Sequence, residues 1–294
     1  PLLEMFLVSV SLAVAAIPEG LPAIVTLTLA IGVQQMAGKN AIVKKLKSVE
    51  TLGSATVVCT DKTGTLTKNE MTVRELFFDN RFIQVTGAGY SPAGDFLEDE
   101  NAVDLSKDAV FQKLLESAVL CNSAFVDFEG REVKPIGDPT EVALLVCGKK
   151  AGFDSESLEK KFKPIFELSF DSERKMMSTV HDFDSTRKIV FVKGAPEQVL
   201  LKSTKVFSGG KEKPLSDADK KRFLSANQGL AEKAFRVLAV AYKTIPSSSP
   251  AASKTIDFDE KTLESQLVFV GLLGMIDPPR PEAKLAIQTA LQAG

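Results

Sequence analysis

An aspartate with neighbours suited to phosphoryl transfer lies at residue 61. Asp61 follows an apolar run, residues 55–59, that predicts a short buried strand, and it precedes a loop with the sequence Lys-Thr-Gly-Thr-Leu-Thr. Ligands of open α/β sheets bind just beyond the carboxyl ends of the strands. A loop of glycine and small hydroxyl residues brings backbone N–H groups close to phosphate oxygens. The pattern predicts that Asp61 accepts a phosphoryl group; the alternative is an ordinary turn aspartate.

The residue two places after Asp61 restricts this chemistry. Phosphatases of the haloacid dehalogenase class, which the loop resembles, usually carry a second aspartate there, and this chain has Thr63. A threonine hydroxyl is no acid–base catalyst near neutral pH, so a phosphoenzyme should hydrolyse slowly. Residues 61–65, Asp-Lys-Thr-Gly-Thr, resemble the phosphorylation motif of P-type ion-pumping ATPases. That resemblance implies catalytic roles for Asp61, Lys62, Thr63 and Thr65, with Mg²⁺ held by Asp61 and the Thr63 carbonyl.

Composition excludes several other kinds of site. With 36 basic and 38 acidic side chains in 294 residues, the chain has no charge excess that would favour nucleic acid. Its three cysteines are too far apart in sequence for a metal or disulfide framework. A single histidine, His181, excludes a histidine-based triad or zinc site, and its acidic neighbours predict a solvated surface residue.

The first 37 residues are mostly apolar and predict one transmembrane helix, broken between Pro18 and Pro22. Four lysines follow between residues 39 and 47, and the positive-inside rule therefore places residues 39–294 in the cytoplasm. The chain is thus expected to be integral to a lipid bilayer, a plasma membrane in a prokaryote or otherwise an endomembrane. The alternative is a buried helix of a soluble protein.

The break itself predicts half of a cation site. Pro18 and Pro22 lack N–H groups, so the carbonyls of Val14 and Pro18 should lose their helical partners. Glu19 lies beside them, and carboxylate and carbonyl oxygens suit hard cations; the alternative is a proline kink with Glu19 snorkelling or protonated. Residues 13–22 resemble the fourth transmembrane helix of the calcium-pump branch of the P-type ATPases. The transported ion, Ca²⁺ or Mn²⁺, would then bind Glu19 and the carbonyls of Val14, Ala15 and Ile17.

From residue 71 onward the pattern predicts a soluble α+β region. Helices are expected at residues 113–120, 141–149 and 281–291, and strands at residues 166–170, 189–192, 238–242 and 267–273. Together with the family resemblance, this gives a fold class of α/β plus α+β with one transmembrane helix. It would comprise an incomplete haloacid dehalogenase-like phosphorylation domain with an inserted antiparallel-sheet nucleotide-binding domain.

Several segments of this region resemble the nucleotide-binding domain of the same family: residues 137–141, 170–177 and 193–196, and the arginine of Phe-Arg-Val-Leu-Ala. Chemically, the set offers an aromatic face for a purine, a carboxylate for its amino group and cations for a triphosphate. The resemblance implies an ATP site formed by Glu141, Phe170, Lys175, Lys193, Gly194, Arg236 and Asp277. Taken singly, Phe170 could be a core residue, Lys193 a solvated charge and Glu141 a first-turn acid.

One position departs from the family pattern. Ser172 stands where the animal calcium pumps carry an arginine, so that phosphate contact is either missing or supplied by Arg174.

The order of these motifs suggests a domain organisation. Residues 1–37 would be the membrane helix, 38–70 the stalk and first segment of the phosphorylation domain, 71–276 the nucleotide-binding domain, and 277–294 the hinge. The chain resembles an internal fragment of a type II P-type ATPase of the calcium-transporting branch. Its partners would be the remaining membrane helices, the actuator domain and the rest of the phosphorylation domain, and alone it should bind ATP without turnover. The rival interpretations are a soluble dehalogenase-type phosphatase or phosphotransferase and a non-catalytic nucleotide-binding module.

Overall fold

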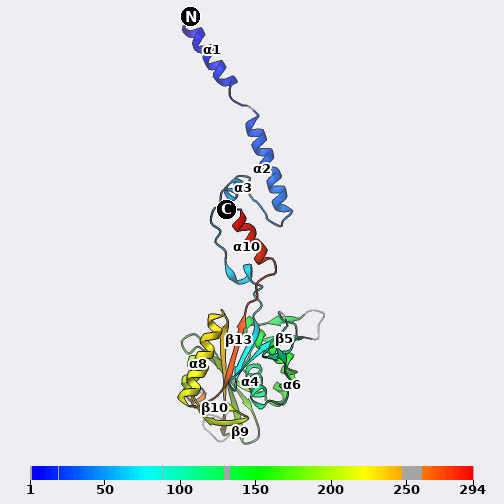
Figure 1. Ribbon diagram of the computed structural model, residues 1–294, viewed down its shortest axis with the longest axis vertical. Coiled ribbons are helices and arrows are strands. Elements are labelled where there is room, and N and C mark those ends of the chain that lie inside the picture. Colours follow the sequence, from blue (N-terminus) through cyan, green and yellow to red (C-terminus); the bar gives the residue numbers. More distant parts are fainter. Residues whose placement is uncertain (1, 19, 88, 129–132, 247–259, 294) are drawn as a thin grey trace. The chain divides into compact units, whose positions relative to one another are not determined.

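The computed structural model describes residues 2–18, 20–87, 89–128, 133–246 and 260–293 (Figure 1). Two compact units share the chain. The first comprises residues 1–60 and 287–294, and the second residues 61–286.

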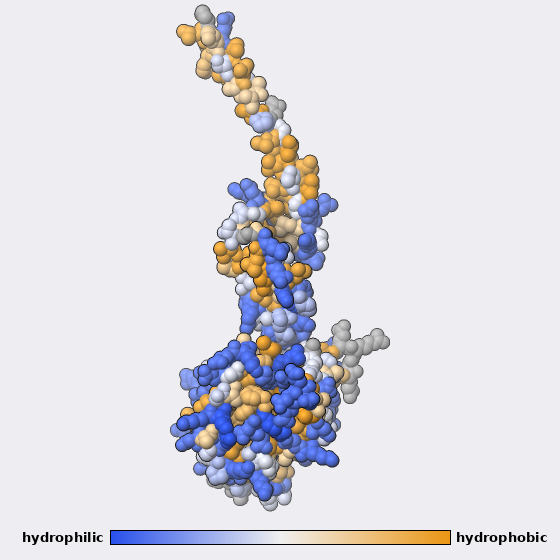
Figure 2. All heavy atoms as spheres, viewed as in Figure 1, coloured by the Kyte–Doolittle hydropathy of each residue, from blue (hydrophilic) through white to orange (hydrophobic). Residues whose placement is uncertain are grey.

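The first unit begins with two apolar helices, α1 (Leu2–Ala15) and α2 (Leu21–Ala37), followed by α3 (Lys47–Gly53). Nearly all side chains of α1 and α2 are exposed, and Figure 2 shows apolar atoms along both helices. The predicted transmembrane segment over residues 1–37 is divided by the proline segment, as expected, into helices of 14 and 17 residues. Within the described residues, no helix combines the length and the apolar character needed to cross a membrane.

The backbone at the break also differs from the expectation. The N–H of Ile17 donates to the Val14 carbonyl at 3.1 Å, and the N–H of Leu21 donates to the Pro18 carbonyl at 3.0 Å. In both, the carbonyl of residue i accepts from the N–H of residue i+3, the tighter 3₁₀-type hydrogen bond that is common at helix ends. The two carbonyls that were expected to be freed by proline are therefore hydrogen-bonded. Glu19 lies outside the described residues.

Residues 55–60, before Asp61, do not form the predicted strand. Val57 and Val58 are 76% and 73% exposed instead of buried. A strand forms by pairing its backbone groups with a neighbour, and in the described part of the chain no strand pairs with this run. Local apolar character was therefore insufficient to predict a strand.

The second unit is built on a large, mainly antiparallel sheet. Its strands are arranged in the order β4-β3-β2-β1-β13-β12-β9-β8-β7, with β10 pairing with both β11 and β13. A separate hairpin joins β5 to β6. The bounds are β1 (Thr72–Phe78), β2 (Arg81–Val85), β3 (Phe96–Glu98), β4 (Asn101–Ala102), β5 (Phe125–Asp127), β6 (Lys134–Ile136), β7 (Pro164–Asp171), β8 (Met176–Asp182), β9 (Arg187–Gly194), β10 (Ser203–Ser208), β11 (Lys211–Pro214), β12 (Arg236–Pro246) and β13 (Leu267–Ile276).

Helices cover both faces of this sheet. One face carries α4 (Ala109–Leu120), α5 (Pro139–Lys150) and α6 (Ser155–Lys161), and the other carries α7 (Pro196–Lys202), α8 (Asp217–Glu232) and α9 (Glu260–Leu263). Figure 1 shows α4 and α6 on the opposite side of the strands from α8. Two further elements lie outside the sheet: the short π-helical segment η1 (Lys62–Leu66), and α10 (Ala283–Gln292), which follows β13. The antiparallel sheet, and each helix and strand predicted between residues 113 and 291, are confirmed.

Strand periodicity explains the two cores. Along β9, Ile189 and Phe191 pack into the core under α4, while Val190 and Val192 pack into the core under α7 and α8. Successive strand residues point to opposite faces, so a strand covered on both sides is apolar throughout. The continuous apolar run at 189–192 is the sequence signal of this arrangement.

The chain enters and leaves the sheet through neighbouring strands. β1 and β13 are antiparallel partners, and the first pair in their register is Thr72 with Ile276. The segments before and after the sheet therefore meet at one end of the same strand pair.

Candidate functional site

A cavity of about 470 Å³ opens where β7, β8 and β9 approach the start of α5. Its volume is within the range of small-molecule pockets in proteins, ~300–1,000 Å³. Among the residues predicted to bind nucleotide, it is lined by Glu141, Phe170, Lys193, Gly194 and Arg236. These residues come from four different elements and are separated by up to 95 positions in the sequence (236 − 141). Most of the predicted nucleotide residues therefore meet at one cavity.

Glu141 and Lys193 form an ion pair in the wall of this cavity. The Lys193 Nζ lies 2.6 Å from the Glu141 Oε1, and the two side chains are only 7% and 16% exposed. The other carboxylate oxygen, Oε2, accepts the backbone N–H of Ser123 at 3.3 Å. Lys193 is therefore not the solvated strand-end charge that its sequence position also allowed. Removing either partner would leave the other poorly solvated and without its counter-charge.

Phe170 lines the cavity and is 62% exposed. Simple alternation along β7 would place it on the same face as Phe166 and Leu168. The register between β7 and β8 shifts between Leu168 and Asp171, which inserts one extra residue into β7. A bulge of this kind redirects the following side chain. Phe170 is thus an exposed aromatic face, and the alternative of a core residue is wrong.

Glycine at 194 permits the close approach of β9 to the turn before β8. A Cβ at this position would lie 2.4 Å from the Lys175 carbonyl oxygen and 2.6 Å from the Met176 Cγ. No side chain fits there without a shift of the backbone. Gly194 therefore lines the cavity at the point where β9 and the turn before β8 lie closest together.

Lys175 and Arg174 do not line the cavity. Lys175 is exposed in the turn between β7 and β8, with a φ of 55°. The Arg174 guanidinium instead contacts Glu264, with Nη1 and Oε1 2.5 Å apart, and its Nε lies 3.3 Å from Glu260. Arg174 is therefore engaged by α9 and the residue after it, and it is not among the residues that line the cavity.

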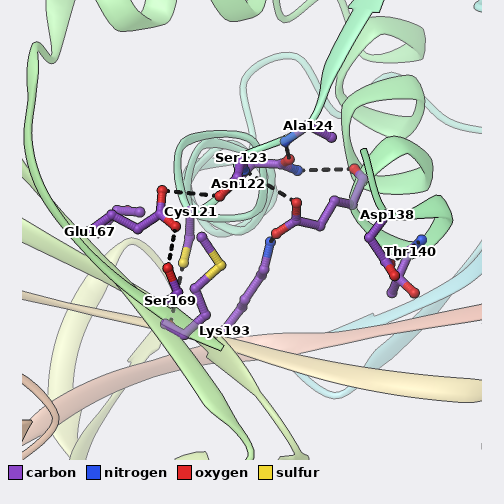
Figure 3. A network of polar contacts seen from close by, with 12 residues as sticks. Cys121, Asn122, Ser123, Ala124, Asp138, Thr140, Glu167, Ser169 and Lys193 are labelled. Carbon is purple, nitrogen blue, oxygen red and sulfur yellow. Dashed lines mark hydrogen bonds and ion pairs between the residues drawn. The ribbon is translucent and has the colours of Figure 1, made fainter. Parts of the chain in front are cut away.

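A polar network that the sequence did not reveal closes one end of the cavity (Figure 3). Ser123 donates its hydroxyl to Glu167 at 3.0 Å, and Ser169 donates to the other oxygen of Glu167 at 2.9 Å. The Asn122 amide donates to the Glu141 carbonyl at 3.0 Å and accepts the Ala124 N–H at 2.8 Å. Residues 122–124 have no motif, and only the fold brings this turn against β7.

The N-terminus of α5 forms another wall. Asp138 caps the helix by accepting the Thr140 N–H at 2.8 Å, as the Gly-Asp-Pro-Thr sequence leads one to expect. Burial opposes ionisation of Asp138, but hydrogen bonds from Thr140 and the positive charge of Arg236 outweigh it and lower the pKa of this carboxyl. Asp138 is therefore ionised and lies near Arg236 in the cavity wall.

A second cavity of about 340 Å³ adjoins the first. The two share Asp138, Thr140 and Arg236, and the second is also lined by Lys62 and Thr63 of the predicted phosphorylation loop and by Asp277. A ligand occupying both would extend from the ring of Phe170, past Arg236, towards Lys62. Asp61 and Thr65 are exposed residues of the same loop and line neither cavity.

Asp277 anchors the segment that follows the predicted phosphorylation loop. Its carboxylate accepts the Thr67 hydroxyl at 2.5 Å and the Glu70 N–H at 3.2 Å. Arg280 adds donor contacts from its side chain to the Thr67 carbonyl at 3.1 Å and the Gly64 carbonyl at 3.2 Å. The segment that contains Asp277 and Arg280 therefore holds the loop although it lies more than 200 residues away in the sequence.

The loop offers oxygen ligands that suit Mg²⁺ in kind. The Asp61 carboxylate accepts the Thr63 N–H at 3.3 Å. The carboxylate and the Thr63 carbonyl therefore belong to the same short turn of the chain. Mg²⁺ commonly takes only one or two carboxylates and completes its octahedron with water and phosphate oxygens. No cluster of three or more acidic, histidine or cysteine side chains able to hold a metal occurs among the described residues.

His181 is buried, contrary to the expectation of a surface residue. It is 2% exposed on β8, where Nδ1 lies 2.9 Å from the Phe162 carbonyl and Nε2 2.9 Å from the Thr179 hydroxyl. Burial lowers the pKa of His181 below its ordinary value. Its acidic neighbours do not share this burial, because Asp182 is the exposed last residue of β8 and Asp184 lies beyond the strand.

Comparison with known proteins agrees with this arrangement. The family model described as "P-type ATPase, cytoplasmic domain N" matches residues 110–282. This chain belongs to the P-type ATPase family. It is 46% identical over 292 residues to Calcium-transporting ATPase 1 of Bacillus cereus, covering 99% of this chain and 30% of that protein.

Two further relatives are similar over the same extent. Calcium-transporting ATPase of Bacillus subtilis is 41% identical over 293 residues, with 100% of this chain and 32% of that protein covered. Calcium-transporting ATPase lmo0841 of Listeria monocytogenes is 40% identical over 299 residues, with 100% and 30% covered. The chain thus spans about a third of the length of the curated relatives it matches.

Proposed function

We propose that the 470 Å³ cavity binds ATP, with the adenine ring against Phe170 and the triphosphate directed past Arg236 into the second cavity. The observation that carries this proposal is the convergence of an exposed aromatic ring, a buried Glu141–Lys193 pair and Arg236 on one cavity in a P-type ATPase domain N. Aromatic faces bind purines, and guanidinium groups match phosphate geometry.

The position of each remaining predicted residue suggests a distinct role. Gly194 lines the cavity and lets β9 lie against the turn before β8, and Lys175 provides a positive charge in that exposed turn. Asp277 acts on the nucleotide site indirectly, by holding the Thr67–Glu70 segment beside the second cavity. Lys62 lines that cavity and would neutralise charge on the terminal phosphate.

The proposed reaction in the intact protein is phosphoryl transfer to Asp61. A carboxylate oxygen of Asp61 attacks the γ-phosphorus, the bond from that phosphorus to the bridging β–γ oxygen breaks, and ADP leaves. Thr65 is exposed in the same loop and would donate its hydroxyl to a phosphoryl oxygen. Mg²⁺, held partly by Asp61 and the Thr63 carbonyl, would stabilise the charge on the transferred group.

We infer that the intact protein is an ATP-driven cation pump, and the names of its relatives make Ca²⁺ the first candidate for the transported ion, with Mn²⁺ as the alternative. Ion ligands would come from Glu19 and from the backbone carbonyls of Val14, Ala15 and Ile17, completed by other helices of the same pump. The exposed apolar side chains of α1 and α2 support contact with a lipid bilayer. Residues 39–294 would lie on the cytoplasmic side, as the description of the matching family model suggests.

The domain organisation proposed from the sequence follows from these assignments. Residues 38–70 would be the stalk and first segment of the phosphorylation domain, 71–276 the nucleotide-binding domain, and 277–294 the hinge into the second segment. The actuator domain and the rest of the phosphorylation domain would be partners within the same pump.

Two measurements test the proposal. Isothermal titration of the 294-residue chain with ATP should show binding without hydrolysis, and Phe170→Ala should weaken it by about tenfold, since base–aromatic stacking is worth ~1–3 kcal/mol. Lys202→Ala, on the opposite side of the sheet in α7, provides the control. In the full-length protein, [γ-³²P]ATP should give an acid-stable label that Asp61→Asn removes. ATP binding without any such label would instead favour a non-catalytic nucleotide-binding module.

A further inference from the structure

An arginine outside the nucleotide cavity contacts the irregular part of β7. The bulge places two residues of β7, Ser169 and Phe170, opposite a single residue of β8, Met177. The Arg174 Nη2 donates to the Ser169 carbonyl at 2.8 Å. This carbonyl belongs to the peptide group that joins Ser169 to Phe170. Arg174 therefore holds the backbone directly before the aromatic residue of the cavity.

Arg174 reaches the bulge from the other face of the sheet. Together with Met176 and residues of α7 and α9, it lines a separate cavity of about 160 Å³. Met177, the next residue of β8, lines the nucleotide cavity instead. Successive strand residues point to opposite faces, so the two cavities lie on opposite sides of β8. The contact to the Ser169 carbonyl thus links one face of the sheet to the site on the other.

Acidic side chains fix the direction of the Arg174 guanidinium. Its Nη1 lies 2.5 Å from the Oε1 of Glu264, a residue that is 2% exposed. The same oxygen accepts the Ser178 hydroxyl at 2.5 Å, and the Arg174 Nε lies 3.3 Å from Glu260. A guanidinium is planar and rigid. Holding Nη1 at Glu264 therefore also sets the direction of Nη2.

The turn after β7 holds the backbone on the other side of Phe170. The Asp171 Oδ1 accepts the N–H of Glu173 at 2.9 Å and that of Arg174 at 2.8 Å. The Asp171 carbonyl accepts the Lys175 N–H at 2.7 Å. The backbone is thus held before and after Phe170, while this residue remains 62% exposed.

We propose that Arg174 is a positioning residue for the nucleotide, which keeps the Phe170 ring at the cavity before ATP arrives. This inference rests on the proposed binding of adenine against Phe170. Ordering a side chain or loop on binding costs free energy, so a ring that is already in place binds more tightly. Arg174 acts through the Ser169 carbonyl, without a contact of its own to the nucleotide.

The first test replaces Arg174 with lysine. Arg174→Lys keeps a positive charge beside the buried Glu264 carboxylate, but a single ammonium does not reproduce the fork that joins Glu264 to the Ser169 carbonyl. Isothermal titration of the 294-residue chain with ATP should show binding weakened by about threefold. This loss is part of the roughly tenfold loss expected for Phe170→Ala.

A double-mutant cycle distinguishes positioning of the ring from other effects. In a chain that already carries Phe170→Ala, Arg174→Lys should not weaken ATP binding further, because no ring remains to be positioned. Adenosine, titrated by NMR into the chain with Phe170 present, should lose the same factor of about three in Arg174→Lys. A direct contact from Arg174 to a phosphate would leave the affinity for adenosine unchanged.

Arg187 offers a matched control. Its Nε and Nη2 lie 2.8 Å and 2.6 Å from the Asp184 carboxylate, and its side chain is 54% exposed. Arg187 is the first residue of β9 and is not among the residues that line the nucleotide cavity. Arg187→Lys should therefore leave ATP binding unchanged.

Several results would overturn the inference. Unchanged ATP affinity in Arg174→Lys, with Phe170→Ala still weakening binding, would refute the role of Arg174 and leave the proposed function intact. Equal losses with and without Phe170, or an unchanged affinity for adenosine, would show that Arg174 does not act through the ring. An equal loss in Arg187→Lys would show a general effect of such substitutions. If Phe170→Ala did not weaken ATP binding, the proposed place of the adenine ring would be wrong, and this inference with it.

Discussion

Replacing Lys193 with methionine should destabilise the second unit strongly. The substitution keeps most of the side-chain volume but leaves the Glu141 carboxylate, 16% exposed, without the ammonium that lies 2.6 Å from it. Removing one member of a buried ion pair costs ~3–5 kcal/mol, and the partial exposure of Glu141 favours the lower end of that range. A loss of about 3 kcal/mol would lower the melting temperature by ~6–12 °C in a domain of this size.

Urea unfolding followed by circular dichroism in the absence of nucleotide measures this loss directly. A surface pair of similar geometry provides the control: Lys205 and Glu212 are 2.8 Å apart, but their side chains are 53% and 38% exposed. Lys205→Met should cost less than ~1 kcal/mol, because exposed pairs contribute little.

The double variant distinguishes lost pairing from lost packing. Replacing both residues, with Lys193→Met and Glu141→Leu together, removes the uncompensated charge and should recover most of the stability, since apolar replacements of buried pairs are often neutral. The reasoning would be refuted if Lys193→Met cost no more than Lys205→Met, or if the double variant were as unstable as Lys193→Met alone.

Three further predictions concern other parts of the second unit. Burial lowers the pKa of His181 below its ordinary value of 6.5, so the unfolded chain binds a proton at His181 more readily than the folded chain does. The free energy of unfolding measured by urea titration should therefore fall as the pH drops below 6.5. It should fall less in His181→Gln. Gly194→Ala should destabilise the second unit by ~1–3 kcal/mol, because the added Cβ has no room. Gly229→Ala in α8 should stabilise it by ~0.5–1 kcal/mol, because there the added Cβ would meet nothing within 4 Å beyond the adjoining helix backbone. Calorimetric melting that gave both changes the same sign would contradict this reasoning. Asp277→Ala should speed hydrogen exchange at the Glu70 amide by about tenfold, and an unchanged rate would show that this contact does not protect it.

The sequence predicted β7, β9, β12 and β13 and the helices α4, α5 and α10 because their signals are periodic and local. Residues 189–192 are apolar without interruption, as a strand covered on both faces must be, and β9 is such a strand. The start of α5 was readable from its Asp-Pro-Thr cap. The same local reasoning failed at residues 55–59, where a strand needs a partner that no described residue provides.

At the candidate site, the motifs indicated Glu141, Phe170, Lys193 and Arg236, but they did not indicate the polar network of Ser123 and Glu167. Phe170 reaches the cavity only through the bulge in β7, which alternation cannot predict. Glu167 and Ser123 come together across 44 positions (167 − 123) and belong to no recognisable motif. His181 is buried because β8 is covered on both faces, whereas its acidic neighbours lie at and beyond the end of that strand. The positions of Phe170, the Ser123–Glu167 contact and His181 all depend on tertiary structure, which no short segment of the sequence determines.

The pairing of Thr72 with Ile276 has a mechanical consequence. Because β1 and β13 are antiparallel, a force that draws the preceding and following segments apart acts across the strand pair at one end. Backbone hydrogen bonds in such a pair lie perpendicular to the strands. They would therefore be loaded one after another, as in opening a zipper, and the sheet should yield at this end under far less force than if it were pulled along its strands.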